Sequence, residues 1–494
     1  MKKKILFINP SQSAPIGAKC TNFKIPLGFI YMAGSLEKKG FEVKILDCPL
    51  HYKKRRVINK ESVRMGLFPS DVIKQIKDFN PDIVGVSCAY TAFEKDSFET
   101  IKAVRKASKE MKKKILIVVG GAHTSANSKF VLRNKDIDIA VLGEGEETIL
   151  EIAEKYQKGK SLTNILGTAT IDKGKFKENK RRDYIQNLDA LSPAWHLLEL
   201  PLYFDHPDNS WATMRSPTVD IVTSRGCPGN CVFCSIHTVW GHKWRARSAK
   251  NVVDEIEMLV KKYGVRQFRM QDDNISLDKK RIIEICDEIV KRKLDIKWDT
   301  PNGVAIWTLN EEVIGKMAKA GCYRITFGIE SACLNTQKYV RKVIDFNKIR
   351  KIIDICHKKR MWVCSTFIIG FPYEKKEDIE ETRNFILTSK INFPFIYVAQ
   401  PYLGTDMYKD FQKEGLMKGI KYTSHIGKSK YNTLYLKNEE LNNFRDKLYK
   451  EFYIRKSLSF LNPVKFYKEF LSKIKSFEDL RYILKNVLFI ALRG

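Results

Sequence analysis

The chain has 494 residues, of which 44% are hydrophobic, so it is too long for one ordinary core, and two or three domains are predicted. No uninterrupted apolar stretch approaches the ~20 residues of a membrane span. Near the amino terminus only Ile5 to Ile8 are apolar, which is too short for the core of a secretory signal peptide. The protein is therefore expected in the cytoplasm, with its 11 cysteines as reduced thiols. A net charge of +31 suits anionic partners. Solvated lysine-rich helix faces are the favoured explanation of this charge, and without a recognised nucleic-acid motif we expect no nucleic acid as a partner.

Residues 1–158 alternate short apolar runs with amphipathic segments, as a doubly wound, Rossmann-like parallel α/β sheet does. Strands are predicted at Lys4 to Ile8, Glu42 to Leu46, Ile83 to Ser87, Ile115 to Val119 and Ile139 to Leu142. Ligands of such sheets bind at the carboxyl ends of the strands. That edge holds Asn9, Ser87, the pair Gly120-Gly121 with His123, and Gly143-Glu144. Paired glycines there let a backbone approach a ligand, although they are also common in plain turns.

Residues 159–217 are predicted to connect the first domain to the second. Thr168 to Ile171 is a candidate strand of a small hairpin, and Trp195 and Tyr203 lie in an aromatic stretch interrupted by prolines. Packing between domains is the simpler explanation for these aromatic side chains. Covering a substrate is the alternative.

Strand–helix alternation resumes six times across residues 218–404 and predicts a partial TIM barrel, (β/α)6. Strands are expected near Asp220 to Thr223, Gln267 to Met270, Ile296 to Asp299, Tyr323 to Phe327, Val363 to Ile369 and Phe395 to Ala399. Ser248 and Ser276 are the predicted N-caps of the first two helices. The chemistry of such barrels lies on loops after the strands. Here those loops carry Asp272, Asn302, Gly328, Glu330, Ser331 and Gly370.

Three cysteines, Cys227, Cys231 and Cys234, follow the first of these strands in a loop broken by Gly and Pro. Thiolates at such short spacing converge on one soft metal centre, either zinc or an iron–sulfur cluster. Structural zinc takes four protein ligands, and His237 could be the fourth, whereas a cubane held by three cysteines keeps one iron open. Unliganded thiols are the third interpretation.

Cys-x-x-x-Cys-x-x-Cys with Phe233 before the last cysteine resembles the motif of the radical S-adenosylmethionine (radical SAM) superfamily. The resemblance implies a 4Fe-4S cluster on Cys227, Cys231 and Cys234, whose open iron chelates S-adenosylmethionine (SAM) and reduces it to a 5′-deoxyadenosyl radical. It implies that Phe233 contacts the adenine, that Asp272 and Glu330 contact the polar end or ribose, and that Gly370 lies in the adenine-side loop. Asn302, Gly328 and Ser331 occupy further SAM-contacting strand ends.

Beside this loop, the first domain resembles the cobalamin-binding domains fused to many radical SAM enzymes. The implied cobalamin contacts are Asn9, Ser87, Gly120, Gly121, His123, Gly143 and Glu144. The Asp-x-His-x-x-Gly motif of cobalamin mutases is absent after the first strand, so the cobalt has no obvious imidazole ligand. His123 is a candidate for that ligand, although a histidine beside a Gly-Gly turn is more often a contact of the nucleotide tail or simply exposed.

Two arginines, Arg245 and Arg247, close a polar segment that begins directly after the cysteines. They are candidates to meet an anion such as a substrate phosphate or the cobalamin phosphate. Ordinary salt bridges between domains are the equally weighted alternative.

Residues 405–494 leave the alternating pattern and are expected to form an α-helical extension. A helix is predicted at Glu439 to Lys456, and Ser476 to Asp479 forms a capping box for the last one. Basic, amphipathic helices with aromatic residues can lie on an anionic membrane. A helical cap over the open barrel accounts for the same residues.

Taken together, these features predict a cobalamin-dependent radical SAM enzyme that methylates an unactivated carbon of a small-molecule or lipid-like substrate. A second SAM would remethylate the cobalt, and ferredoxin or flavodoxin would supply electrons. A cobalamin-linked radical cyclase or lyase is the first alternative, and a non-catalytic basic scaffold with a structural metal is the second. Peripheral contact with the inner membrane face belongs to the membrane interpretation of the C-terminal helices.

Overall fold

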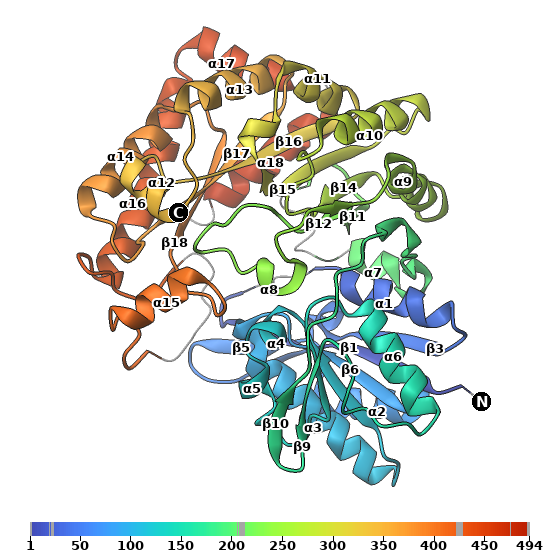
Figure 1. The fold of residues 1–494 in the computed structure, drawn as a ribbon. Helices are drawn as coiled ribbons and strands as arrows, with labels where there is room; N and C mark the ends of the chain where they lie inside the picture. Colours follow the sequence, from blue (N-terminus) through green and yellow to red (C-terminus); the bar gives the residue numbers. More distant parts are fainter. Residues whose placement is uncertain are drawn as a thin grey trace. The chain divides into compact units, whose positions relative to one another are not determined.

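The computed structural model describes residues 2–18, 20, 24–204, 206, 213–420, 428–474 and 476–491. The chain divides into two compact units (Figure 1). Unit 1 contains residues 1–210 and also 236–241, and unit 2 contains residues 211–235 and 242–494. The finer boundaries expected at residues 158, 217 and 404 stay predictions.

Unit 1 is built on a seven-stranded sheet of order β10-β9-β8-β7-β6-β1-β3. Its strands are β1 (Lys4–Asn9), β3 (Glu42–Asp47), β6 (Ile83–Ser87), β7 (Leu116–Gly120), β8 (Ile139–Val141), β9 (Thr168–Asp172) and β10 (Lys175–Glu178). The first five are parallel, as predicted. The hairpin β9–β10 extends the sheet with antiparallel strands, and it contains the strand expected at Thr168.

Alternate side chains of these strands enter two separate cores, because successive residues of a strand point to opposite faces. Leu6 and Ile8 pack with α2 (Pro69–Phe79) and α3 (Glu94–Glu110) on one face. Ile5 and Phe7 pack with α1 (Leu27–Glu37) and α6 (Glu146–Gln157) on the other (Figure 1). The sheet is therefore doubly wound, which confirms the predicted Rossmann-like class.

Smaller elements complete unit 1. They are β2 (Gln12–Pro15), β4 (Arg55–Val57) and β5 (Ser62–Met65), which form a three-stranded sheet, the helices α4 (Ala122–Ala126), α5 (Ser128–Val131), α7 (Leu200–Phe204) and α8 (His237–Trp240), and the 3-10 turns η1 (Cys48–His51), η2 (Thr91–Phe93), η3 (Leu188–Ala190) and η4 (Trp195–Leu197). Trp195 and Tyr203 of the connector are fully buried in this unit, which agrees with a packing role.

Unit 2 contains a parallel six-stranded sheet in strict chain order, β11-β14-β15-β16-β17-β18. The strands are β11 (Thr218–Ile221), β14 (Gln267–Met270), β15 (Lys297–Val304), β16 (Cys322–Glu330), β17 (Trp362–Ile369) and β18 (Phe393–Val398). Helices follow them, namely α9 (Ala249–Tyr263), α10 (Lys279–Lys291), α11 (Glu311–Lys319), α12 (Leu334–Val340), α13 (Phe346–Lys358), α14 (Lys376–Thr388) and α15 (Asp406–Lys413). The turn η6 (Ile306–Thr308) follows β15. This is the predicted (β/α)6 arrangement.

One predicted cap is right and one is wrong. The Ser248 side chain accepts a hydrogen bond from the Asn251 amide at the start of α9. Helix α10 is capped by Asp278 instead of Ser276. The Ser276 hydroxyl hydrogen-bonds Thr308 in the buried interior, so its polar group is already satisfied before the helix begins.

The C-terminal extension is helical, with α16 (Asn438–Ser459), α17 (Pro463–Glu469), the turn η7 (Leu471–Lys473) and α18 (Phe477–Ala491). Helix α16 covers β18, the edge strand: the Tyr449 hydroxyl accepts from the Ile396 amide at 2.7 Å, and Arg445 Nε donates to the Ile396 carbonyl at 2.8 Å. An open sheet edge is thereby closed. No helix of the described residues has the length and apolarity that crossing a membrane requires.

Candidate functional site

The cysteine loop leaves the sheet through the short strand β12 (Ser224–Arg225), which pairs with β13 (Arg245–Ala246). Gly226 has φ +86°, a conformation that favours glycine. Its amide donates to Asp273 Oδ2 at 2.9 Å. Burial raises the pKa of Asp273 to about 7. The turn at Gly226 and its hydrogen bond to the Asp273 carboxylate thus fix the position where the cysteine loop begins.

Asp272 holds the residues that lead into the same loop through hydrogen bonds. It is buried, and it accepts from the Thr223 amide at 2.7 Å, from the Thr223 hydroxyl at 2.6 Å and from the Ser224 hydroxyl. Arg281 donates to Thr223 in turn. The SAM contact expected of Asp272 stays a prediction; in the structure its carboxylate holds the loop backbone.

The three thiols are partly exposed, and they lie in a loop with room between them. A Cβ placed on Gly229 would stand 3.4 Å from Cys227 Sγ and 3.9 Å from Cys231 Sγ, so both sulfurs flank a space that the missing side chain leaves free. Among the described residues, no three or more ligating side chains are gathered as around a single metal ion. A cubane needs no such convergence, because each cysteine binds a different iron, so the donor set fits a cluster.

A lysine that the sequence analysis did not single out lies beside these thiols. Burial raises the pKa of Cys231 and of Cys227, and the Lys342 ammonium opposes both shifts. Lys342 Nζ also donates to Glu330 Oε1 at 3.0 Å. A Cβ on Gly328 would meet both groups, at 2.6 Å and 2.7 Å, so the predicted glycine makes room for this ion pair.

Glu330 itself has an unusual backbone. Its φ is +67°, in the left-handed region that non-glycine residues rarely adopt, and the register of β16 against β17 shifts at this point. Its second oxygen accepts from the Thr366 hydroxyl at 3.2 Å. Such conformations cost free energy and cluster at ligand sites. Glu330 and Lys342 together present one anion and one cation, which suits a zwitterion.

The loop after β17 contacts the cysteine loop through aromatic rings. The centroids of Phe233 and Phe371 are 6.2 Å apart. Gly370, at φ +83°, donates its amide to Glu374 Oε2 at 2.5 Å. Burial raises the pKa of Glu374 to about 8. Glu374 therefore fixes the predicted adenine-side loop from within, a role that no sequence pattern indicated.

The two remaining SAM candidates differ in exposure. Asn302 is exposed, and its Nδ2 donates to the Gln271 carbonyl at 2.8 Å. Ser331 is buried, its hydroxyl hydrogen-bonds Thr382 at 3.0 Å, and it accepts from the Cys333 amide at 3.2 Å. Of the two, Asn302 is the one in reach of a ligand, and Ser331 orders the turn that leads into α12.

The residues directly after the cysteines have separate partners. His237 is part of unit 1, and its Nδ1 lies 3.3 Å from the Gly241 carbonyl oxygen. Arg247 is buried in unit 2, where it pairs with Glu255 and donates to the Val222 carbonyl. Its guanidinium thus fastens α9 to the sheet of its own unit. The expectation that Arg245 and Arg247 meet an anion, or form salt bridges between domains, stays a prediction.

In unit 1, the chain order of the strands reverses between β1 and β6. Ligands of doubly wound sheets bind at this switch point, so Asn9 and Ser87, at the ends of these two strands, lie at the expected edge. Asn9 Nδ2 donates to Asp47 Oδ1, and the Tyr203 hydroxyl donates to Asp47 Oδ2, both at 2.7 Å. Burial raises the pKa of Asp47 to about 7.

His123 is buried and bonded through both ring nitrogens. Nδ1 lies 2.8 Å from Thr91 Oγ1, and Nε2 lies 2.7 Å from Glu94 Oε2. In this arrangement no lone pair of the imidazole is directed at a metal. His123 therefore offers no free lone pair to a cobalt ion, which fits a cobalamin held without an imidazole from this residue.

Gly121 allows the loops after β6 and β7 to lie close together. At φ +119°, a Cβ there would stand 2.8 Å from the Cys88 carbonyl oxygen and from Ala89 Cα. Gly120 is partly exposed beside it. The pair therefore lets the loop after β6 lie against the loop after β7, and only Gly120 is left to approach a ligand.

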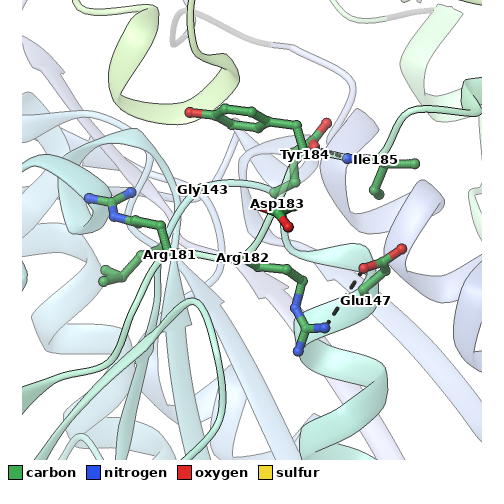
Figure 2. A pocket seen from close by; sticks show the side chains of 9 residues that line it. Gly143, Glu147, Arg181, Arg182, Asp183, Tyr184 and Ile185 are labelled. Carbon is green, nitrogen blue, oxygen red and sulfur yellow. Dashed lines mark hydrogen bonds and ion pairs between the residues drawn. The ribbon is translucent and has the colours of Figure 1, made fainter.

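Gly143 and Glu144 line a small pocket in unit 1, together with Arg181 to Ile185 of the connector (Figure 2). Glu144 Oε2 accepts from the Ile185 amide at 2.8 Å, and the Gly143 amide donates to Ser125 Oγ at 2.9 Å. Arg181 donates to the Ser125 and Thr238 carbonyls. This end of β8 is thus joined to both the connector and α8.

Comparison with known proteins agrees with this division. Residues 221–386 match the Radical SAM superfamily model, and residues 14–153 match the B12 binding domain model. An uncharacterized methyltransferase of Pyrococcus horikoshii is 32% identical over 92% of this chain and 93% of its own. The chain belongs to the cobalamin-dependent radical SAM enzymes. The cytidylyl-2-hydroxyethylphosphonate methyltransferase of Streptomyces wedmorensis is 29% identical to this radical SAM enzyme, over 84% of this chain and 83% of its own.

The fold of this radical SAM enzyme is that of a solved relative. The cobalamin-dependent SAM radical enzyme OxsB with aqua-cobalamin bound aligns over 99% of this chain and 75% of its own, with a TM-score of 0.71 at 17% identity. A 4Fe-4S cluster, SAM and cobalamin are accordingly the cofactors of the family to which the chain belongs. The sequence predicted the family and its cofactors. It did not indicate the roles of Lys342 and Asp273, which depend on contacts between distant segments, or the role of Glu374, whose carboxylate is buried and accepts from amides of its own loop.

Proposed function

We propose that this enzyme transfers a methyl group to an unactivated carbon of a small-molecule or lipid-like substrate. The observation that carries the proposal is the match to a methyltransferase along nearly the whole of both chains. When bound, the cluster and SAM supply a 5′-deoxyadenosyl radical that takes a hydrogen atom from the substrate, and methylcobalamin supplies the methyl group.

Within unit 2, Cys227, Cys231 and Cys234 hold the cluster through their thiolates. The ion pair of Lys342 and Glu330 binds the charged methionine end of SAM, and the left-handed backbone of Glu330 aims its carboxylate there. Phe233 packs against the adenine. The other residues that we propose for the SAM site are Asp272, Asn302, Gly328, Ser331 and Gly370. Asp272 and Ser331 act there by holding the backbone of neighbouring loops.

Within unit 1, cobalamin binds at the switch point. Its contacts are Asn9, Ser87, Gly120, Gly121, His123, Gly143 and Glu144. Asn9 and His123 act through the hydrogen bonds that fix this edge, with Asp47 and with Thr91 and Glu94. No imidazole is assigned to the lower face of the corrin.

Two partners complete the proposal. A small electron carrier, ferredoxin or flavodoxin, reduces the cluster, because the reductive cleavage of SAM consumes an electron. Peripheral contact with an anionic membrane through the C-terminal helices brings the enzyme to a lipid-like substrate.

Anaerobic reconstitution with methyl-labelled SAM tests the function. The wild type is expected to form 5′-deoxyadenosine and labelled product, and Cys231→Ala is expected to lose the cluster and both products, while Cys364→Ala, a buried cysteine outside the loop, keeps them. A product without label would replace methyl transfer by radical cyclisation or cleavage. Turnover by Cys231→Ala without a cluster would refute the assignment of the loop.

A further inference from the structure

The last turns of α16, together with α17 and η7, expose a row of large apolar side chains. They are Ile454, Leu458, Leu461, Val464, Tyr467 and Leu471, which are between 41% and 80% exposed. We call this row the C-terminal face. Successive members are three or four residues apart in the sequence, and within α16 and within α17 this spacing places them on one side of the helix. A row of this length is more than the scattered apolar residues found on any surface.

The opposite side of the same segment packs against the barrel sheet of unit 2. Phe460, Phe466 and Phe470 pack on one another, with ring centroids 5.3–5.4 Å apart. Phe470 then contacts Trp362 at the start of β17, at 5.9 Å. The inner phenylalanines therefore pack towards the barrel strands, and the side chains of the C-terminal face stay exposed.

Basic residues outnumber acidic ones in the segment that carries the face. Between Phe452 and Ile474 the sequence has five lysines or arginines, and its one carboxylate is Glu469. That carboxylate is buried and pairs with Lys456 at 2.6 Å. Lys473 is also buried, donating to the Met361 carbonyl at 2.7 Å.

Of the three other cations, Arg455 is exposed and pairs with Glu451 at 3.0 Å, and Lys465 and Lys468 are exposed among the apolar side chains. A second copy of this chain would place the same cations opposite one another, in a protein whose net charge is already +31. An anionic lipid surface instead offers phosphates to the cations and an acyl boundary to the apolar side chains.

We propose that the C-terminal face docks on the surface of an anionic lipid bilayer, with Leu461 and Tyr467 inserted at the headgroup level and Lys465 and Lys468 on the phosphates. The inference gives the membrane partner of the proposed function a defined surface, and it holds whatever reaction the two cofactor sites catalyse.

Sedimentation of the full-length protein with vesicles tests the docking. Vesicles of phosphatidylcholine with added phosphatidylglycerol are expected to bind the protein at low salt, and vesicles of phosphatidylcholine alone are expected to bind it far less. Burying one aliphatic side chain contributes about 1.5 kcal/mol or more, so the double variant Leu461→Ser/Tyr467→Ser should bind at least about tenfold more weakly. Each lysine near an anionic surface contributes about 1 kcal/mol, so Lys465→Glu/Lys468→Glu should lose at least about tenfold as well.

Val57→Ser is the matched control, because Val57 is 67% exposed on β4 and belongs to unit 1, whereas this face belongs to unit 2. Failure of the wild type to bind anionic vesicles would overturn the inference, as would equal binding by Leu461→Ser/Tyr467→Ser and Val57→Ser. A dimer in solution that Leu461→Ser/Tyr467→Ser dissolves would overturn it in favour of a second copy. Formation of 5′-deoxyadenosine by the same variants, measured without vesicles, keeps this outcome separate from failure of the proposed chemistry.

Discussion

The Lys342 ammonium interacts electrostatically with two groups, the Glu330 carboxylate and the Cys231 thiol. Its ammonium pairs with Glu330 and opposes the effect of burial on the Cys231 thiol, so it favours the thiolate that binds iron. A protonated thiol is a poor metal ligand, and metal binding must release its proton. The lysine therefore helps the loop to assemble its cluster before SAM arrives.

Lys342→Met is expected to raise the pKa of Cys231 further. In cluster-free protein at neutral pH, the modification of Cys231 by iodoacetamide, resolved by mass spectrometry, should then be slower than in the wild type. Lys348→Met removes an exposed lysine of the next helix and should leave the rate unchanged. Equal rates in the two variants would argue against the electrostatic role of Lys342.

Glu374 gives the stability of unit 2 a pH dependence. Burial raises the pKa of Glu374 from 4.5 to about 8, so the folded state holds this proton more tightly than the unfolded chain does. The resulting stabilisation is complete below pH 4.5 and is lost as the pH rises towards 8.

Between about pH 5 and about pH 8, the free energy of unfolding of the wild type should therefore fall by about 2–4 kcal/mol relative to Glu374→Gln. Urea titrations at both pH values measure this difference. Glu377→Gln, which changes an exposed carboxylate, should follow the wild type at both values. A pH dependence that survives in Glu374→Gln would assign it to another group.

At the scale of elements, the sheet edge of unit 1 depends on the contact between the loops after β6 and β7. Gly121→Ala should cost roughly 2–3 kcal/mol of unfolding free energy, because the new Cβ would meet the Cys88 carbonyl at 2.8 Å and the backbone has φ +119°. Chemical denaturation measures the loss. Gly17→Ala, with nothing within 4 Å, is the control and should change stability by less than about 1 kcal/mol.

The elements were largely predictable from sequence. Strand–helix alternation placed the strands of both units, because buried parallel strands are short apolar runs. Single caps were less certain: Ser276 carries a capping side chain, but the helix begins after Asp278, and only the fold shows that Thr308 engages the serine. Lys342 carries no local pattern, since it pairs with Glu330 at the end of β16. Glu374 accepts from the Gly370 amide in its own loop, but only the fold shows that its carboxylate is buried.

At the scale of the whole molecule, the cofactor assignments fall on separate units. The three cysteines belong to unit 2, and the seven assigned cobalamin contacts belong to unit 1. The Cys231→Ala variant is therefore expected to lose its iron and yet bind cobalamin with an affinity within about threefold of the wild type, since that changes binding by less than 1 kcal/mol. Iron analysis and the visible absorbance of bound cobalamin measure both. Loss of cobalamin together with iron would contradict this independence.

The segment 236–241 belongs to unit 1 although the chain has already entered unit 2 before it. Helix α8 packs on α4, and the Arg181 guanidinium donates to the Thr238 carbonyl. During synthesis, which proceeds from the amino terminus, unit 1 therefore stays incomplete until residue 241 has left the ribosome. By then all three cysteines have emerged, yet most of the strands of their own unit do not exist. The maturation of the two units is thus interleaved, and a ribosome stalled shortly after residue 210 would carry a first unit that lacks one of its helices.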